Sequence, residues 1–125
     1  MKRIALLALL AVPVAAAYAQ DKPLTGDEVK ALVSGKTLRF PVNANGTLSN
    51  FKLESDGTGS GNSSNLKWRN TLSYTVKWRV EDSGKLCTHV QQAGSNEYCS
   101  EVQKGPENSY LRVRSGKVEG KFTVD

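Results

Sequence analysis

This 125-residue sequence contains few side chains that are typical of catalytic or metal-binding sites. They are two cysteines, Cys87 and Cys99, and a single histidine, His89. A cysteine can act as a nucleophile, bind a metal ion or form a disulfide. His89 lies two residues after Cys87, and Glu97 lies two residues before Cys99. The spacing therefore raises three alternatives: a reactive thiol, a metal site that includes His89 and Glu97, and a disulfide.

The first 19 residues have the layout of a secretory signal. Lys2 and Arg3 precede an apolar run over residues 4–17, and the small-residue pattern Ala-Tyr-Ala ends at Ala19. The run is shorter than the roughly 20 residues that a membrane-spanning helix needs. We therefore expect cleavage after Ala19, a secreted or periplasmic location, no membrane span, and a single domain over residues 20–125.

Strand pairing favours the disulfide. Residues 85–102 read as two extended segments around a turn, and a three-residue loop ending in Gly94 would set Cys87 opposite Cys99. The same register forms two opposite-charge pairs, Lys85 with Glu101 and His89 with Glu97. In an oxidising compartment this arrangement predicts a disulfide on the outer face of a hairpin. It leaves His89 in a solvated pair, and we expect neither a metal site nor a cofactor.

Residues 72–80 show the clearest strand pattern of the chain. Leu72, Tyr74, Val76, Trp78 and Val80 alternate strictly with polar residues, and a period of two predicts a half-buried strand. A turn ending in Gly84 would pair this strand with the next one. Trp78 would then face Thr88 inside, and Arg79 would face Cys87 outside.

Short strands and tight turns continue along the chain. A turn at Ser115-Gly116 would set Val113 opposite Val118 and Leu111 opposite Gly120. Residues 56–65, rich in glycine, serine and asparagine, predict a loop or a weak edge strand, and residues 66–70 a short strand. Connections this short leave no room for helical crossovers. We expect a mainly β domain, a single antiparallel up-and-down β-barrel or sandwich of about eight strands between residues 37 and 124.

One short N-terminal helix is expected near residues 25–34. Thr25 and Glu28 form the pattern of a capping box, and Gly35 suits the end of the helix. Val29 and Val33 belong to an apolar stripe, and a helix this short is not stable alone in water. We expect it to cover one end of a barrel.

These motifs together resemble small secreted bacterial proteins of unknown function with a lipocalin-like, calycin-type barrel. The residues that carry the resemblance are Leu24, Thr25, Gly26, Glu28, Leu32, Gly35 and Thr37, then Asp56, Gly57 and Thr58, then Trp78, Val80, Gly84, Lys85, Leu86, Cys87 and Cys99. The resemblance covers most of residues 20–125 and implies the fold and an extracytoplasmic location. It implies no catalytic residue.

The segments "LKWRN" and "VKWRV" form a near-repeat ten residues apart. Alternation predicts Trp68 and Trp78 on the apolar side, with Lys67, Arg69, Lys77 and Arg79 on the other. One interpretation is two core indoles beneath a solvated basic face. The other is a cationic stripe that contacts an anionic envelope component, extended by Arg112 and Arg114. Tyr74 and Tyr98, with the two tryptophans, are candidates for core or ligand-contacting aromatic residues.

The net charge of the chain limits the classes of partner that it is expected to bind. The formal net charge is +5, and Lys2 and Arg3 supply two of those charges. This modest excess and the expected export argue against a nucleic-acid partner. We expect a non-enzymatic binding or interaction barrel whose partner is an anionic envelope component, a protein or a small apolar ligand. The alternative is a secreted inhibitor of an envelope-degrading enzyme such as lysozyme. An enzyme is disfavoured, because the acidic residues lie mainly in turns and on outward positions.

Overall fold

The computed structural model describes residues 22–125, so the predicted signal segment and its cleavage site lie outside the described residues. In this part of the chain one helix precedes eight strands. The elements are α2 (Gly26–Val33), β1 (Lys36–Phe40), β2 (Thr47–Leu53), β3 (Thr58–Asn65), β4 (Asn70–Val80), β5 (Leu86–Val90), β6 (Tyr98–Lys104), β7 (Ser109–Arg114) and β8 (Lys117–Val124).

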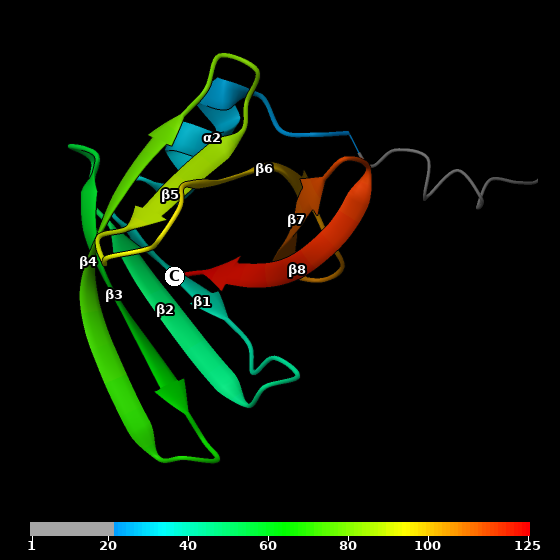
Figure 1. The fold of residues 1–125 in the computed structure, drawn as a ribbon. Coiled ribbons are helices and arrows are strands. Elements are labelled where there is room, and N and C mark those ends of the chain that lie inside the picture. The colour runs from blue at the N-terminus through cyan, green and yellow to red at the C-terminus, as the bar shows by residue number, and fades with distance from the viewer. Residues whose placement is uncertain (1–21) are drawn as a thin grey trace, which may run out of the picture.

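The strands form a closed antiparallel barrel in which each strand pairs with its neighbours in sequence and β8 returns to β1 (Figure 1). The predicted fold class is confirmed, as a barrel rather than a sandwich. The seam between β1 and β8 is short, because only Leu38 and Arg39 of β1 pair with β8. Backbone hydrogen bonds between Thr37 and Asp125 extend it. Beyond Arg39, the end of β1 and the first half of β8 are not paired with each other.

The alternation predicted for β4 is present from Tyr74 to Val80, whereas Leu72, predicted on the apolar side, is 57% exposed. Trp78 pairs with Thr88 and Arg79 with Cys87, in the predicted register. Val76 and Trp78 are buried, and the Trp78 indole N–H donates to the Glu54 carbonyl at 2.7 Å. This bond satisfies the polar atom of a core indole. The inner face is completed by fully buried side chains of other strands, among them Leu38, Leu53, Val102 and Phe122.

Helix α2 lies at one end of the barrel, and the turns β1–β2 and β3–β4 lie at the other end (Figure 1). Thr25 and Glu28 form the predicted capping box, at 3.2 and 2.8 Å. Val29 and Val33 are fully buried in the barrel core, so the helix seals its end. No helix among the described residues is long and apolar enough to cross a lipid bilayer.

The prediction of a loop or weak edge at residues 56–65 is wrong for most of that segment. Residues 58–65 form the interior strand β3, which pairs along its whole length with β2 and β4. Gly61 faces inward there, and a Cβ atom at this position would lie 2.4 Å from the Tyr74 ring. Pairing on both sides supplies the stability that these polar residues lack as strand formers. The glycine makes room for a neighbouring aromatic ring.

The predicted strand at residues 66–70 is a turn instead. The Asn65 side chain accepts hydrogen bonds from the backbone N–H groups of Lys67 and Trp68 at 2.9 and 2.8 Å. Arg69 adopts a positive φ of 56°. Asparagine often closes a turn in this way, and the turn joins β3 to β4.

The hairpin β7–β8 departs from the predicted register by one residue. Val113 pairs with Val118 as predicted, but Arg112, not Leu111, is the partner of Gly120. A β-bulge between Arg112 and Val113 causes the shift, with Glu119 as the extra residue. Arg112 also pairs with Val102, a core residue, so Arg112 faces into the barrel.

Candidate functional site

The end of the barrel opposite α2 contains a cavity of about 310 Å³. Phe40 and the loop 41–43 form one wall, and residues 119–121 of β8 form the opposite wall. These are the parts of β1 and β8 that lie beyond their short ladder. Ser49 and Phe51 of β2 also line the cavity. Val29 and Val33 of α2 thus fill the core at the helix end, and this cavity lies at the opposite end.

Aromatic rings form the apolar side of this cavity. The Phe40 ring centroid lies 5.3 Å from that of Phe51 and 5.4 Å from that of Phe122. Phe51 meets Tyr74 edge-on at 6.0 Å. Such tilted and edge-on contacts are the favoured geometries of aromatic pairs. The wall therefore offers a preformed apolar surface.

A row of hydroxyl groups crosses the inner face beside these rings. The Ser49 and Ser63 hydroxyl oxygens are 3.0 Å apart, and Ser63 lies 2.8 Å from the Tyr74 hydroxyl. Ser49 lines the cavity, so one end of this row is available to a bound molecule. Tyr74, a predicted core or ligand aromatic, contributes through Ser63 and through its contact with Phe51.

Arg112 is the cation inside the cavity. Its guanidinium carbon lies 4.7 Å from the Phe40 ring centroid and 5.0 Å from that of Tyr98. These are cation–π distances. The Nε atom of Arg112 is buried, and none of the described residues provides a hydrogen-bond partner for it. The cavity thus holds a positive charge that aromatic faces position but no carboxylate neutralises.

The carboxylate that lines the cavity together with Arg112 is already engaged. Glu119 accepts a hydrogen bond of 2.7 Å from the Tyr98 hydroxyl and lies 3.6 Å from the Nε atom of Arg114. Burial raises the pKa of Tyr98 above its ordinary 10.0, and the hydrogen bond to Glu119 adds to the rise, while the charge of Arg112 opposes it. Tyr98 therefore stays a neutral phenol that donates to Glu119.

Two features of this site were missed by sequence reasoning. Arg112 was assigned to an outer basic stripe, because a regular hairpin would have turned Leu111 inward. Gly120 was treated only as a cross-strand partner. A Cβ atom at Gly120 would lie 2.7 Å from an Nη atom of Arg112, so glycine leaves the space that the guanidinium fills. A bulge prediction in β8 would have revealed both.

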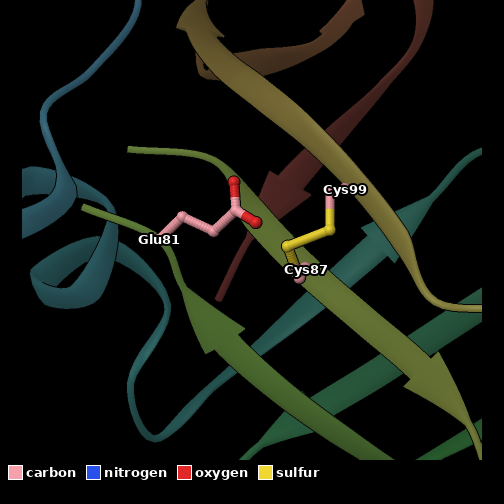
Figure 2. Close-up of side chains that lie close together, drawn as sticks. All are labelled: Glu81, Cys87 and Cys99. Carbon is pink, nitrogen blue, oxygen red and sulfur yellow. A yellow bond between two sulfur atoms is a disulfide. The ribbon is translucent and has the colours of Figure 1, made fainter. Parts of the chain in front are cut away.

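The predicted disulfide between Cys87 and Cys99 is confirmed (Figure 2). Glu81 brings a carboxylate oxygen within 4.8 Å of both sulfur atoms. The three side chains could resemble a metal site, but bonded sulfurs are not the thiolates that bind zinc. Cys87 itself is fully buried and Arg79 lies opposite it on the outer face. Cys87 and Cys99 therefore act as a covalent cross-link between β5 and β6, and Glu81 lies beside it.

The predicted pair between His89 and Glu97 is not formed. The β5–β6 ladder ends at Thr88 and Tyr98, and the Nε2 atom of His89 lies 3.1 Å from the Ser95 carbonyl oxygen. Glu97 instead accepts two hydrogen bonds from Arg79, at 2.9 and 2.8 Å. Two charge-assisted hydrogen bonds to a guanidinium are stronger than one bond to an imidazole, which favours Arg79 over His89 as the partner of Glu97.

The predicted basic stripe is divided in the structure. Arg79 is neutralised by Glu97 and Glu81, whereas Lys67 and Arg69 lie in the β3–β4 turn. Lys77 lies on β4 between these two groups. The four residues therefore do not form one continuous cationic surface.

Trp68 is not a core residue, contrary to the prediction. It lies in the β3–β4 turn and is 71% exposed, and its neighbour Leu66 is 58% exposed. The Lys67 ammonium lies 5.6 Å from the Trp68 ring centroid. The near-repeat was misleading because the shared residues Lys-Trp-Arg lie in a turn in one copy and in a strand in the other.

Comparison of the chain with protein-family profiles, curated proteins and solved structures finds no significant match.

Proposed function

We propose that this protein is a non-enzymatic binding barrel that holds a small molecule in the cavity beside Phe40 and Arg112. The observation that carries the proposal is the difference between the two ends of the barrel. Val29 and Val33 of α2 seal one end, whereas the other contains a cavity of about 310 Å³. Ligand pockets in proteins typically begin near this size, and eight-stranded barrels have room for one small ligand.

The groups that line the cavity support binding rather than turnover. Ser49 has no histidine within its hydrogen-bonded row, since its recorded partner is another serine. His89 pairs with Lys77 in the ladder and shares the outer face with Cys87. A serine nucleophile needs an adjacent general base, and in the described residues the sole histidine faces away from the cavity.

We also propose a secreted or periplasmic location. The signal-like layout of residues 1–19 supports it, and so does the disulfide, because such bonds persist in oxidising compartments. The resemblance to lipocalin-like secreted proteins points the same way and stays a prediction.

Native mass spectrometry of the protein exported from its own host tests the binding proposal. We expect a bound small molecule that denaturation releases. Ser49→Phe, which fills the cavity, should abolish co-purification. Asn50→Phe is the matched control, because its side chain alternates to the outer face of the same strand. Recovery of the parent without any ligand, and equal recovery from both variants, would each contradict the proposal.

The β3–β4 turn favours a second, compatible function at the surface. Leu66 and Trp68 are exposed, and Lys67 and Arg69 flank the indole. Tryptophan and basic side chains together suit the interface of an anionic bilayer. We propose that this turn contacts anionic lipid head groups of the envelope.

Sedimentation with phosphatidylglycerol vesicles tests the surface proposal. Trp68→Ala should reduce the vesicle-bound fraction, whereas Leu48→Ala, on the outer face of β2, should not. Equal binding to neutral phosphatidylcholine vesicles would argue against an electrostatic contribution from the turn.

A further inference from the structure

We infer that the cavity selects small organic anions, a carboxylate with a flat apolar body above all, and that Arg112 is the residue that binds the anionic group. This inference rests on the proposed function and specifies its ligand class. It depends on three observations: the charge balance of the cavity, the position of the guanidinium, and the nature of the surrounding walls.

The cavity is lined by two cations and one carboxylate, and Arg112 is the cation that is partly buried. Arg112, Glu119 and Lys121 line it, and Glu119 is held by Tyr98 and Arg114. The Nε atom of Arg112 is buried, whereas Lys121 is exposed to solvent. Charged groups that lie inside a protein are normally paired. None of the recorded hydrogen bonds or ion pairs in the described part of the chain pairs Arg112.

The guanidinium is positioned by contacts that leave its N–H groups available. Phe40 and Tyr98 contact it through their ring faces, and Gly120 provides space beside an Nη atom. Ring faces stabilise the charge but accept none of the five N–H donors in the ordinary way. A carboxylate matches this planar fork with two parallel hydrogen bonds.

The walls around Arg112 define the remainder of the ligand. Phe40 and Phe51 offer apolar faces on one side. Ser49 places a hydroxyl group at the edge of the same cavity. A molecule with a flat apolar body and one anionic group would contact the rings and Arg112 at once. The second charge of a doubly charged anion would be repelled by the carboxylate of Glu119, which lines the same cavity.

The test compares 2-naphthoate with 2-naphthamide, two probes of nearly the same shape that differ in charge. Binding to the parent protein is measured by ¹H–¹⁵N NMR titration. We expect 2-naphthoate to bind at least about ten-fold more tightly, which corresponds to about 1.4 kcal/mol. We expect the largest shifts at Phe40, Arg112 and Gly120. Preference for the neutral probe, or equal binding of both, would overturn the inference.

Two variants distinguish direct pairing of the ligand carboxylate with Arg112 from a general attraction of the anion to the positive charges around the cavity. Arg112→Gln should remove the ten-fold preference for 2-naphthoate and leave the weaker affinity for 2-naphthamide. Lys121→Gln removes a cation that is exposed at the rim of the same cavity, and it should change the preference less than two-fold. If both variants lose the preference equally, the long-range field and not Arg112 selects the anion.

The outcomes distinguish this inference from the proposed function. If both probes bind equally well in the cavity, the binding barrel stands and the anion selectivity fails. If neither probe binds and no ligand co-purifies from the host, the binding barrel itself fails. The comparison of two probes on the parent protein remains informative even if Arg112→Gln does not fold.

Discussion

The two tryptophans of the near-repeat provide a controlled test of the fold. Trp68 and Trp78 occupy the same position in "LKWRN" and "VKWRV", yet Trp68 is 71% exposed and Trp78 is 9% exposed. Replacing each with alanine removes the same atoms from a nearly identical local sequence. A difference in stability between the two variants therefore reports the burial of Trp78 together with its indole hydrogen bond.

The magnitude for Trp78→Ala follows from its surroundings. A buried indole removes on the order of 200 Å² from water, and about 25 cal/mol per Å² gives an upper value of about 5 kcal/mol. The Glu54 carbonyl also loses its indole donor, which costs roughly 1 kcal/mol more. Part of the new cavity collapses, so we expect about 4 kcal/mol, within the range for aromatic truncation.

Trp68→Ala should change the free energy of unfolding by less than about 0.5 kcal/mol, because exposed turn residues contribute little to packing. Urea denaturation followed by far-UV circular dichroism measures both variants. For a domain of this size 1 kcal/mol shifts Tm by roughly 4–8 °C, so thermal melts should separate them clearly. Trp78→Phe, expected to cost about 1–2 kcal/mol, serves if the alanine variant does not fold. Similar losses for the two alanine variants would refute the assigned register of β4.

Three further predictions concern the cross-link, an ion pair and a glycine. Replacing both Cys87 and Cys99 with alanine should lower the free energy of unfolding by about 3 kcal/mol and leave the barrel folded. Chemical denaturation measures this change, and an unchanged free energy of unfolding would argue against a stabilising disulfide. The hydrogen bonds from Arg79 lower the pKa of Glu97 below its ordinary 4.5. The pair therefore stabilises the fold above pH 4.5 and loses its effect as the pH falls through the lowered value. Carboxyl NMR should show this pKa rise in Arg79→Gln, and no rise would exclude the pairing. Gly61→Ala should destabilise by about 1–3 kcal/mol, because its Cβ would lie 2.4 Å from a tyrosine ring; a neutral result in thermal melts would contradict the close approach.

The parts of the fold that sequence predicted are those with local signals. Strict alternation set the faces of β4, and Gly84 and Gly94 both adopt the positive φ that their turns require. With one face and two turns known, the pairing of Cys87 with Cys99 followed. Such short-range patterns determine register because a shift by one residue would expose every apolar side chain.

The parts that were missed depend on contacts between distant segments. Strand β3 forms from glycine, serine and asparagine because β2 and β4 hydrogen-bond it from both sides. Its own residues have weak strand propensity, so no local pattern indicates it. The turn at Trp68 depends on the Asn65 side chain, which competes with an alternation that would otherwise continue into β4.

The bulge in β8 connects the fold to the proposed site. A regular β7–β8 hairpin would set Leu111 opposite Gly120 and turn two aliphatic side chains of β7 inward. With Glu119 as the extra residue, Gly120 and Phe122 pair with Arg112 and Tyr110, so Arg112 rather than Leu111 shares the inner face with the fully buried Phe122. An inward leucine would have filled this end of the barrel with apolar atoms at no electrostatic cost. The chain instead places a cation beside Gly120, and the carboxylate of the extra residue, Glu119, bonds to Tyr98 and lies near Arg114. Bulges are found preferentially where a strand must redirect a side chain near a functional site, and this one lies beside Arg112, the residue that we propose binds an anionic group.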